Sequence, residues 1–162
     1  MLIGSYSPAL VLISLCVAIL ASYTALDLTG RIATAKGRAV HLWMCGGALA
    51  MGSGVWSMHF IGMLAFSLPI DLGYDLTLTL VSLLIAVLSS GFALWLINQP
   101  SLPLLQLACG ALIMGTGISS MHYMGMAAMR MQPGIDYDPQ LFSASLAIAV
   151  CASAAALWIA FR

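Results

Sequence analysis

Long apolar runs separated by short polar breaks make up almost the whole chain. A helix that crosses a hydrocarbon core about 30 Å thick needs about 20 apolar residues. Five runs reach that length, roughly at residues 8–28, 40–68, 76–97, 104–129 and 140–161. The breaks between them are too short to form domains of their own. The pattern therefore predicts an all-α integral membrane protein, a single bundle of about five transmembrane helices.

Composition supports the same class. Of the 162 residues, 62% are hydrophobic and 6% are charged, and the mean hydropathy is +1.07. A soluble domain has about a quarter charged residues, so this chain has too few charges to cover a surface in water. The net charge of zero gives no sign of a nucleic-acid partner, and we expect none. No basic residue precedes the first run, unlike in a cleavable signal peptide, so we expect a retained span.

The basic residues indicate the orientation, because short loops rich in Lys and Arg stay in the cytoplasm. Arg31, Lys36 and Arg38 lie in the first break, and Arg162 ends the fifth run on the same side. The second break carries two aspartates and no base. We therefore expect the N-terminus outside and the C-terminus in the cytoplasm.

The chain repeats internally with an offset of 63 residues, which carries WSMHFIGM (56–63) onto SSMHYMGM (119–126). The first run joins the series with an offset of 68. Each unit is thus a plain helix followed by a motif helix. Two spans per unit give every copy the same orientation, so we expect copies related by rotation about the membrane normal. The units cover about residues 6–73, 74–136 and, for an incomplete third copy, 137–162.

The motif histidines, His59 and His122, are the most unusual polar residues of the runs. Each lies roughly 12–15 Å below the outer end of its helix, at 1.5 Å per residue. Ionisable side chains at such a depth are rare and usually face the interior of the bundle. Helix periodicity places methionines on the same face as each histidine and on its flank. The candidate metal ligands are therefore Met58, His59, Met63, Met121, His122 and Met126, with Met51 and Met114 in support.

Imidazole and thioether groups form a soft, neutral ligand set. Such a set suits copper, and Cu(I) in particular, better than zinc or a hard cation. The chain has no glutamate, and its aspartates lie at the ends of runs or in breaks. This argues against a carboxylate metal centre and against an acid–base hydrolase. No nucleophile elbow or phosphate loop is visible, so we predict no catalytic residues and no enzyme activity for this segment.

Other interpretations of the motif remain open. A membrane histidine can form a structural hydrogen bond between helices, and methionine and glycine are ordinary packing residues there. The two histidines could instead be axial ligands of a haem. A copper permease or chaperone would use the methionines as successive ligands along a path. We favour a sensing site, because the ligands cluster at one depth.

Two further polar features are interpreted as structural. Asp27 and Arg31 are four residues apart at the end of the first run, the spacing of an ion pair on a helix. His41 begins the second run beside the basic break and has no equivalent in the repeat, which favours an interfacial position.

The doubled motif resembles the MHYT domain, a bacterial integral membrane sensor module. The resemblance covers essentially the whole chain and rests on AMGSGVWSMHFIGMLAF (50–66), IMGTGISSMHYMGMAAM (113–129) and LDLTGR (26–31). It implies copper bound through the Met and His of each copy, with Tyr123 as the tyrosine of the motif. Phe60 takes the place of that tyrosine in the first copy, and neither copy has the threonine of the motif.

The resemblance also implies a function. The expected function is sensing of dioxygen, carbon monoxide or nitric oxide by a multi-pass protein of the bacterial inner membrane. The signal would pass to a cytoplasmic domain, in cis or in trans, such as a cyclic-di-GMP cyclase or phosphodiesterase or a histidine kinase. The resemblance implies a domain of three motifs and six or seven spans, whereas this chain ends within the third unit. Small-residue faces on the second or fifth span would then lack a partner, so we expect homo-oligomers.

The orientation is testable with reporter fusions. A reporter fused after Arg162 should be cytoplasmic, and one inserted between Asp71 and Asp75 should be periplasmic, because most of the bases lie in the first break or at the C-terminus. Paired reporters, one active only inside and one active only outside, measure both positions. The reverse pattern would contradict the orientation and the outward-facing motif.

Overall fold

The computed structural model describes residues 5–67, 73–131, 134 and 136–161. These residues form five helices: α1 (Pro8–Thr34), α2 (Arg38–Ala65), α3 (Leu76–Ile97), α4 (Leu104–Ala127) and α5 (Pro139–Ala160). Each helix is long and apolar enough to cross a membrane. The predicted class, an all-α membrane bundle of about five helices, is confirmed. Asp71 and Arg162, which support the predicted orientation, lie outside the described residues.

The first helix is longer than the apolar run that predicted it. It continues through the polar break to Thr34, instead of ending near residue 28. Arg31 Nε donates to Asp27 Oδ2 at 2.6 Å, and its guanidinium lies 5.1 Å from the centre of the Trp43 ring on α2. The predicted ion pair is therefore confirmed, and it lies inside the helix and not beyond its end.

Four strands of two residues each lie at one end of the bundle. β1 (Ser5–Tyr6) pairs antiparallel with β2 (Phe66–Ser67), and β3 (Gly73–Tyr74) pairs with β4 (Met129–Arg130). These strands end α2 and α4 sooner than the predicted residues 68 and 129. The apolar pattern does not show them, because two residues are too few to give a periodic signal.

The two strand pairs are held in the same way, in agreement with the repeat. Ser7 N–H donates to the Ala65 carbonyl at 2.8 Å, and Asp75 N–H donates to the Ala128 carbonyl at 2.7 Å. The offset of 68 carries Ser7 onto Asp75, and the offset of 63 carries Ala65 onto Ala128. The repeat thus extends from sequence letters to backbone hydrogen bonds, while the exact boundaries of the units stay a prediction.

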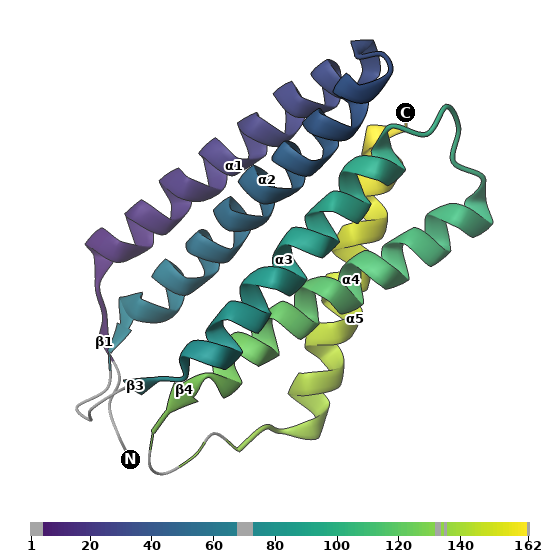
Figure 1. Cartoon of the computed structure of the whole chain (residues 1–162). Coiled ribbons are helices and arrows are strands. Elements are labelled where there is room, and N and C mark those ends of the chain that lie inside the picture. The colour runs from purple at the N-terminus through teal and green to yellow at the C-terminus, as the bar shows by residue number, and fades with distance from the viewer. Residues whose placement is uncertain (1–4, 68–72, 132–133, 135, 162) are drawn as a thin grey trace.

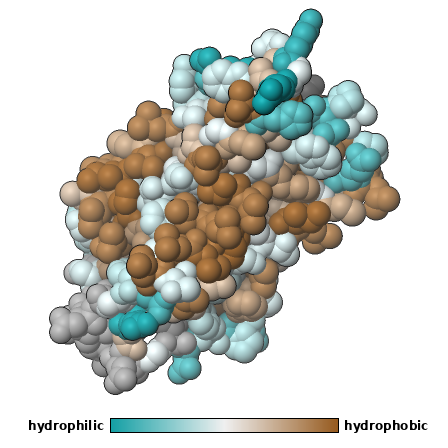
Figure 2. Space-filling model, viewed as in Figure 1, coloured by the Kyte–Doolittle hydropathy of each residue, from teal (hydrophilic) through white to brown (hydrophobic). Residues whose placement is uncertain are grey.

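The bundle has two unlike ends (Figure 1). The strand end carries β1 to β4, and the opposite end carries the turn between α1 and α2, the connection between α3 and α4, and the C-terminus. Figure 2 shows apolar side chains over the surface between the ends and hydrophilic ones mainly near the ends. Leu26, for example, is 76% exposed on α1. Such a surface fits lipid contact, since lipid tails are as apolar as leucine.

Glycines bring neighbouring helices into backbone contact. Gly52 of α2 faces Val87 of α3 so closely that a Cβ on the glycine would lie 2.5 Å from Val87 Cα. Gly115 of α4 faces Val150 of α5 in the same manner, at 2.6 Å. The repeat offset of 63 relates the two glycines and the two valines. Small residues of this kind let membrane helices approach closely, so neither glycine can carry a side chain unless the helices move apart.

We expect Gly52→Ala to destabilise the bundle by about 1–3 kcal/mol, the usual cost of overpacking, because its methyl group would collide with the backbone of α3. Gly46→Ala is a matched control on the same helix, since a Cβ there meets nothing within 4 Å. Thermal unfolding of both variants in one detergent measures the effect. Equal unfolding midpoints would contradict the close packing of α2 on α3.

Candidate metal centre

The two motif histidines meet where α2 faces α4. His59 Nε2 and His122 Nδ1 lie 3.2 Å apart, and the ring centroids are 4.8 Å apart at an interplanar angle of 65°. Which nitrogen donates the proton depends on the tautomer of each ring. The structure thus brings into direct contact the two imidazoles that the repeat pairs in the sequence.

In the second copy, a tyrosine links the imidazole to the next helix. The Tyr123 ring meets the His122 ring at 4.9 Å in an edge-on arrangement. The Tyr123 hydroxyl lies 2.6 Å from Ser145 Oγ on α5, and either oxygen can be the donor. His122 is therefore connected through one side chain to the last helix of the bundle.

In the first copy, which lacks the tyrosine hydroxyl, the indole N–H of a tryptophan makes the corresponding hydrogen bond. Phe60 occupies the position that corresponds to Tyr123 and has no hydrogen-bonding group. Trp56 packs against Phe60 with ring centroids 4.5 Å apart, and its Nε1 donates to Ser82 Oγ on α3 at 2.9 Å. Ser82 is the repeat equivalent of Ser145. Both copies therefore bond an aromatic side chain of the motif helix to the same serine position of the following plain helix.

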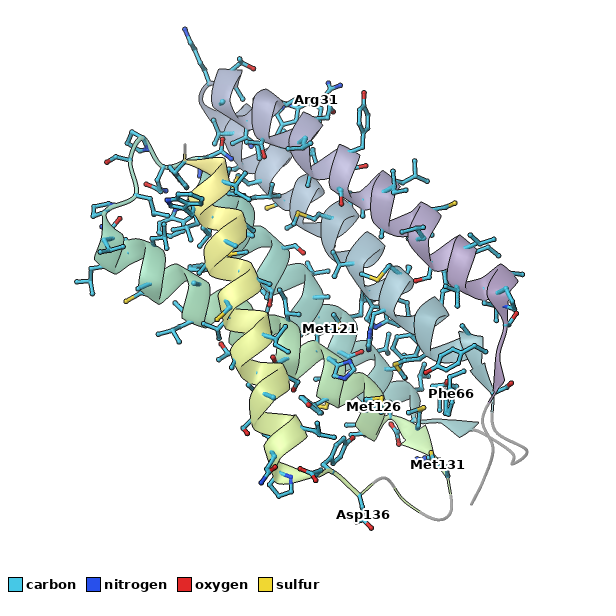
Figure 3. The ribbon with its side chains drawn as sticks, turned by 180° about the vertical axis from the view of Figure 1, so that it is seen from behind. Arg31, Phe66, Met121, Met126, Met131 and Asp136 are labelled. Carbon is cyan, nitrogen blue, oxygen red and sulfur yellow. The ribbon has the colours of Figure 1, made fainter. Side chains whose placement is uncertain are left out.

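A cavity of about 510 Å³ lies beside His59 at the strand end and is rich in sulfur. Met58 and Met63 of α2 and Met126 of α4 line it, so four of the six predicted ligands reach one cavity. Figure 3 shows Met126 and Phe66 close together at this end, with Arg31 at the opposite end of the bundle. The remaining residues of the wall are Tyr6, Ser14, Gly62, Phe66, Met129 and Met131.

Met129 and Met131 are cavity residues that the sequence analysis missed. They lie beyond the repeated motif, where the first copy has Phe66 and Leu68. A signal was nevertheless present, because the two methionines alternate with Arg130, and alternate residues of a strand share a face. The pattern of apolar residues does not predict the strand, so the alternation of the two methionines could not be interpreted as a shared face.

Met121 lines a different space from the four predicted ligands of the cavity, and its part in a metal site stays a prediction. It is 4% exposed and, with the supporting residues Met51 and Met114, lines a separate space of about 70 Å³ between α2, α3 and α4. Figure 3 shows Met121 farther from the strand end than Met126. Met121 and Met126 are five positions apart, about 140° around the helix, so they face different neighbours.

The equivalent of Met121 in the first copy, Met58, is half-buried and lines the cavity beside His59. Met58 lines an open groove of about 350 Å³ between α1 and α2, together with Val55 and Ala21. The repeat equivalents of these residues, Met121, Ile118 and Ser89, line the 70 Å³ space of the second copy. There α2 closes the groove from the other side, whereas no described motif helix precedes α2.

A comparison with protein families identifies the repeat. The family model named MHYT, described as a bacterial signalling protein N-terminal repeat, matches residues 52–110 and 115–162. The chain belongs to the MHYT family. The two matched copies begin 63 residues apart, at the offset that also relates the two histidines.

Curated relatives of this MHYT module are longer signalling proteins. The bifunctional diguanylate cyclase/cyclic di-GMP phosphodiesterase MucR of Pseudomonas aeruginosa is 67% identical over 162 residues, which are 100% of this chain and 24% of the relative. The cyclic di-GMP phosphodiesterase NbdA of the same species is 45% identical over 94% of the chain and 19% of its own length. The signaling protein YkoW of Bacillus subtilis is 34% identical over 97% of the chain and 20% of its own length. The chain thus spans about a quarter or less of these proteins, and no solved structure matches it.

Asp75 and Arg130 form an ion pair at the strand end of the MHYT module. Asp75 caps α3 by accepting from Leu78 N–H at 3.1 Å, and it also binds the guanidinium of Arg130 in β4. The backbone N–H of Leu78, followed by the side chain of Arg130, lowers the pKa of Asp75 below its ordinary value of 3.8. Hydrogen bonds and positive charge favour the ionised form of a carboxyl group.

The lowered pKa of Asp75 makes part of the stability depend on pH. A carboxyl group with a lower pKa in the folded state stabilises the fold above its unfolded pKa, and this contribution is lost as the pH falls through the folded pKa. We expect Asp75→Asn to lower the unfolding midpoint at neutral pH and to differ little from the wild type well below pH 3.8, the ordinary pKa of the carboxyl.

Unfolding midpoints measured across that pH range check this expectation. Asp136→Asn, which changes an exposed loop carboxylate, is the control and should leave the midpoint nearly constant. A deficit of Asp75→Asn that stays the same from neutral to acidic pH would contradict the ion pair.

Proposed function

We propose that this MHYT module is a copper-dependent membrane sensor of a diatomic gas that signals to a cytoplasmic output domain. The observation that carries the proposal is the contact of His59 Nε2 with His122 Nδ1 at 3.2 Å, beside a cavity whose other ligand groups are thioethers. Copper held at the pair would supply a redox-active centre able to bind dioxygen, carbon monoxide or nitric oxide. The ligands proposed are His59 and His122 with Met58, Met63 and Met126.

The donor set fits a soft metal ion. Two nitrogens that bind one ion at about 2.0 Å in tetrahedral geometry lie about 3.3 Å apart, close to the 3.2 Å between the imidazoles. Gly125 leaves space at this point, because a Cβ there would lie 3.6 Å from His59 Nε2. Among the described residues, no group of three or more His, Cys, Asp and Glu comes together. A zinc or magnesium ion would therefore lack its usual ligands.

Haem and copper transport are the alternatives. A haem between the two histidines would need a macrocycle between nitrogens that are 3.2 Å apart, which leaves no space for it without separating α2 and α4. A permease would need ligands along a path to the other end. Met44 lies nearer that end but packs against the hydrophobic cluster of Leu28, Ile32 and Leu94. Both observations favour a stationary copper centre.

The position of the pair suggests how a signal would leave it. α3 packs against both α2 and α4, and a metal at the histidines would add a direct link between these two helices. Tyr123 connects His122 to Ser145 on α5, and α5 leads to the C-terminus at the end opposite the strands (Figure 1). A shift of α4 at the pair would thus act on α5. Two of the relatives named above, MucR and NbdA, are cyclic-di-GMP enzymes by name, and an enzyme of this kind is the proposed output.

Copper retention tests the centre. We expect the purified chain, loaded with Cu(I) and dialysed against a competing chelator, to keep its copper. His59→Ala combined with His122→Ala should lose this tightly held copper while the helical content stays the same, because the two nitrogen ligands are gone. Loss of the infrared band of copper-bound carbon monoxide in the same variant would report the gas site.

Two glycines offer a matched pair for this test. Gly125→Ala places a methyl group next to His59 Nε2, whereas the repeat equivalent Gly62→Ala places it 3.6 Å from Ser14 Oγ, away from the nitrogens. The first should weaken copper binding about 10- to 100-fold, as changes around metal ligands do, and the second should not. Full copper retention by the double histidine variant, or a Soret band in the untreated protein, would overturn the copper centre.

A further inference from the structure

Met129 and Met131 bring sulfur to the cavity from outside the membrane helices. Met129 lies in β4, and Met131 follows that strand. Successive side chains of a strand point to opposite faces, so the two methionines share a face and Arg130 has the other. Both methionines line the cavity, while Arg130 binds Asp75. The positive charge between the two sulfurs in sequence is therefore paired with a carboxylate and directed away from them.

Packing alone does not account for sulfur at these two positions. The repeat relates Met129 to Phe66 and Met131 to Leu68. The sequence of the first copy thus has no sulfur at these positions, and Phe66, which lines the same cavity, packs against Tyr6 with ring centroids 5.1 Å apart. Met129 and Met131, the thioethers of the second copy, line the same cavity as His59, the histidine of the first copy.

The outer part of this cavity has the chemistry of a site for a soft cation. Met63, Met126, Met129 and Met131 line the cavity from α2, α4 and the strand end, and all four are half-buried. The described wall contains no carboxylate and no thiol. Neutral thioethers bind Cu(I) and leave hard cations in water. His59 lines the same cavity, so the sulfurs lie on the way to the histidine pair.

We infer that Met63, Met126, Met129 and Met131 form a second, all-thioether site that takes a soft monovalent cation, Cu(I), at the strand end. The existence of this site is independent of the proposed function, whereas its role as the entry to the histidine pair rests on it. With both ions bound, Met63 and Met126 would hold the ion of the thioether site, and Met58 would remain with the histidine pair; with one ion bound, they are free to pass it from one site to the other.

Silver is the probe for this site, because Ag(I) is a soft monovalent ion that does not change oxidation state under the assay conditions. The full chain in detergent is dialysed to equilibrium against Ag(I), and the bound metal is measured per chain. Met129→Leu combined with Met131→Leu removes two sulfurs with little change of volume. We expect this variant to bind one Ag(I) ion fewer than the wild type and to keep the histidine-bound ion.

Met44→Leu combined with Met124→Leu is the matched control. It also removes two sulfurs, from half-buried methionines that do not line the cavity, and should leave the silver count unchanged. His59→Ala combined with His122→Ala should lose the histidine-bound ion and keep the thioether-bound one. X-ray absorption of silver in the histidine variant should then show sulfur ligands alone.

The outcomes separate this inference from the proposed function. If the Met129 and Met131 double variant binds as much silver as the wild type, or if the control loses as much, the thioether site is overturned and the histidine centre is unaffected. If the histidine variant binds as much metal as the wild type while the methionine variant loses one ion, the proposed copper centre fails and the thioether site stands. Nitrogen or oxygen ligands around silver in the histidine variant would also overturn the thioether site.

Discussion

Close contact between each motif helix and the plain helices beside it is the constraint on which the rest of the bundle depends. In lipid there is no hydrophobic force between helices, so van der Waals packing and interhelical hydrogen bonds hold them together. Gly52 lets the backbone of α3 lie against α2, and Gly117 lets Ser89 of the same helix lie against α4. Because these glycines bring both motif helices close to α3, α2 and α4 come near enough for one imidazole to reach the other across the interface.

The number and position of the helices could be predicted because lipid imposes a length and an apolar surface on every span. The helix ends could not, because they depend on contacts made elsewhere. Arg31 extends α1 through an ion pair and a contact with Trp43 of the next helix, and neither effect is visible in a hydropathy pattern. The two-residue strands depend on hydrogen bonds between segments about 60 residues apart in sequence, which a local pattern cannot contain.

The candidate centre was predictable in its histidines and less so in its methionines. His59 and His122 have the same place in two copies of one unit, so equal depth follows from the repeat itself. The repeat does not reveal which helices pack against each copy. Met121 is enclosed because α2 precedes it in the bundle, and this neighbour separates it from Met126. The counterparts of Met129 and Met131 in the first copy are Phe66 and Leu68, which have no sulfur, so a search for ligands shared by the two copies passes over them.

The open groove beside Met58 bears on which substitutions each copy accepts. Among the described helices, none packs on the first copy in the way that α2 packs on the second. Met58 borders the groove between α1 and α2, whereas Met121 is enclosed by three helices. A larger residue in place of Met58 has free space to enter, while one in place of Met121 displaces packed side chains. The same methionine therefore has different surroundings in the two copies, so a substitution at Met58 meets fewer packed side chains than one at Met121.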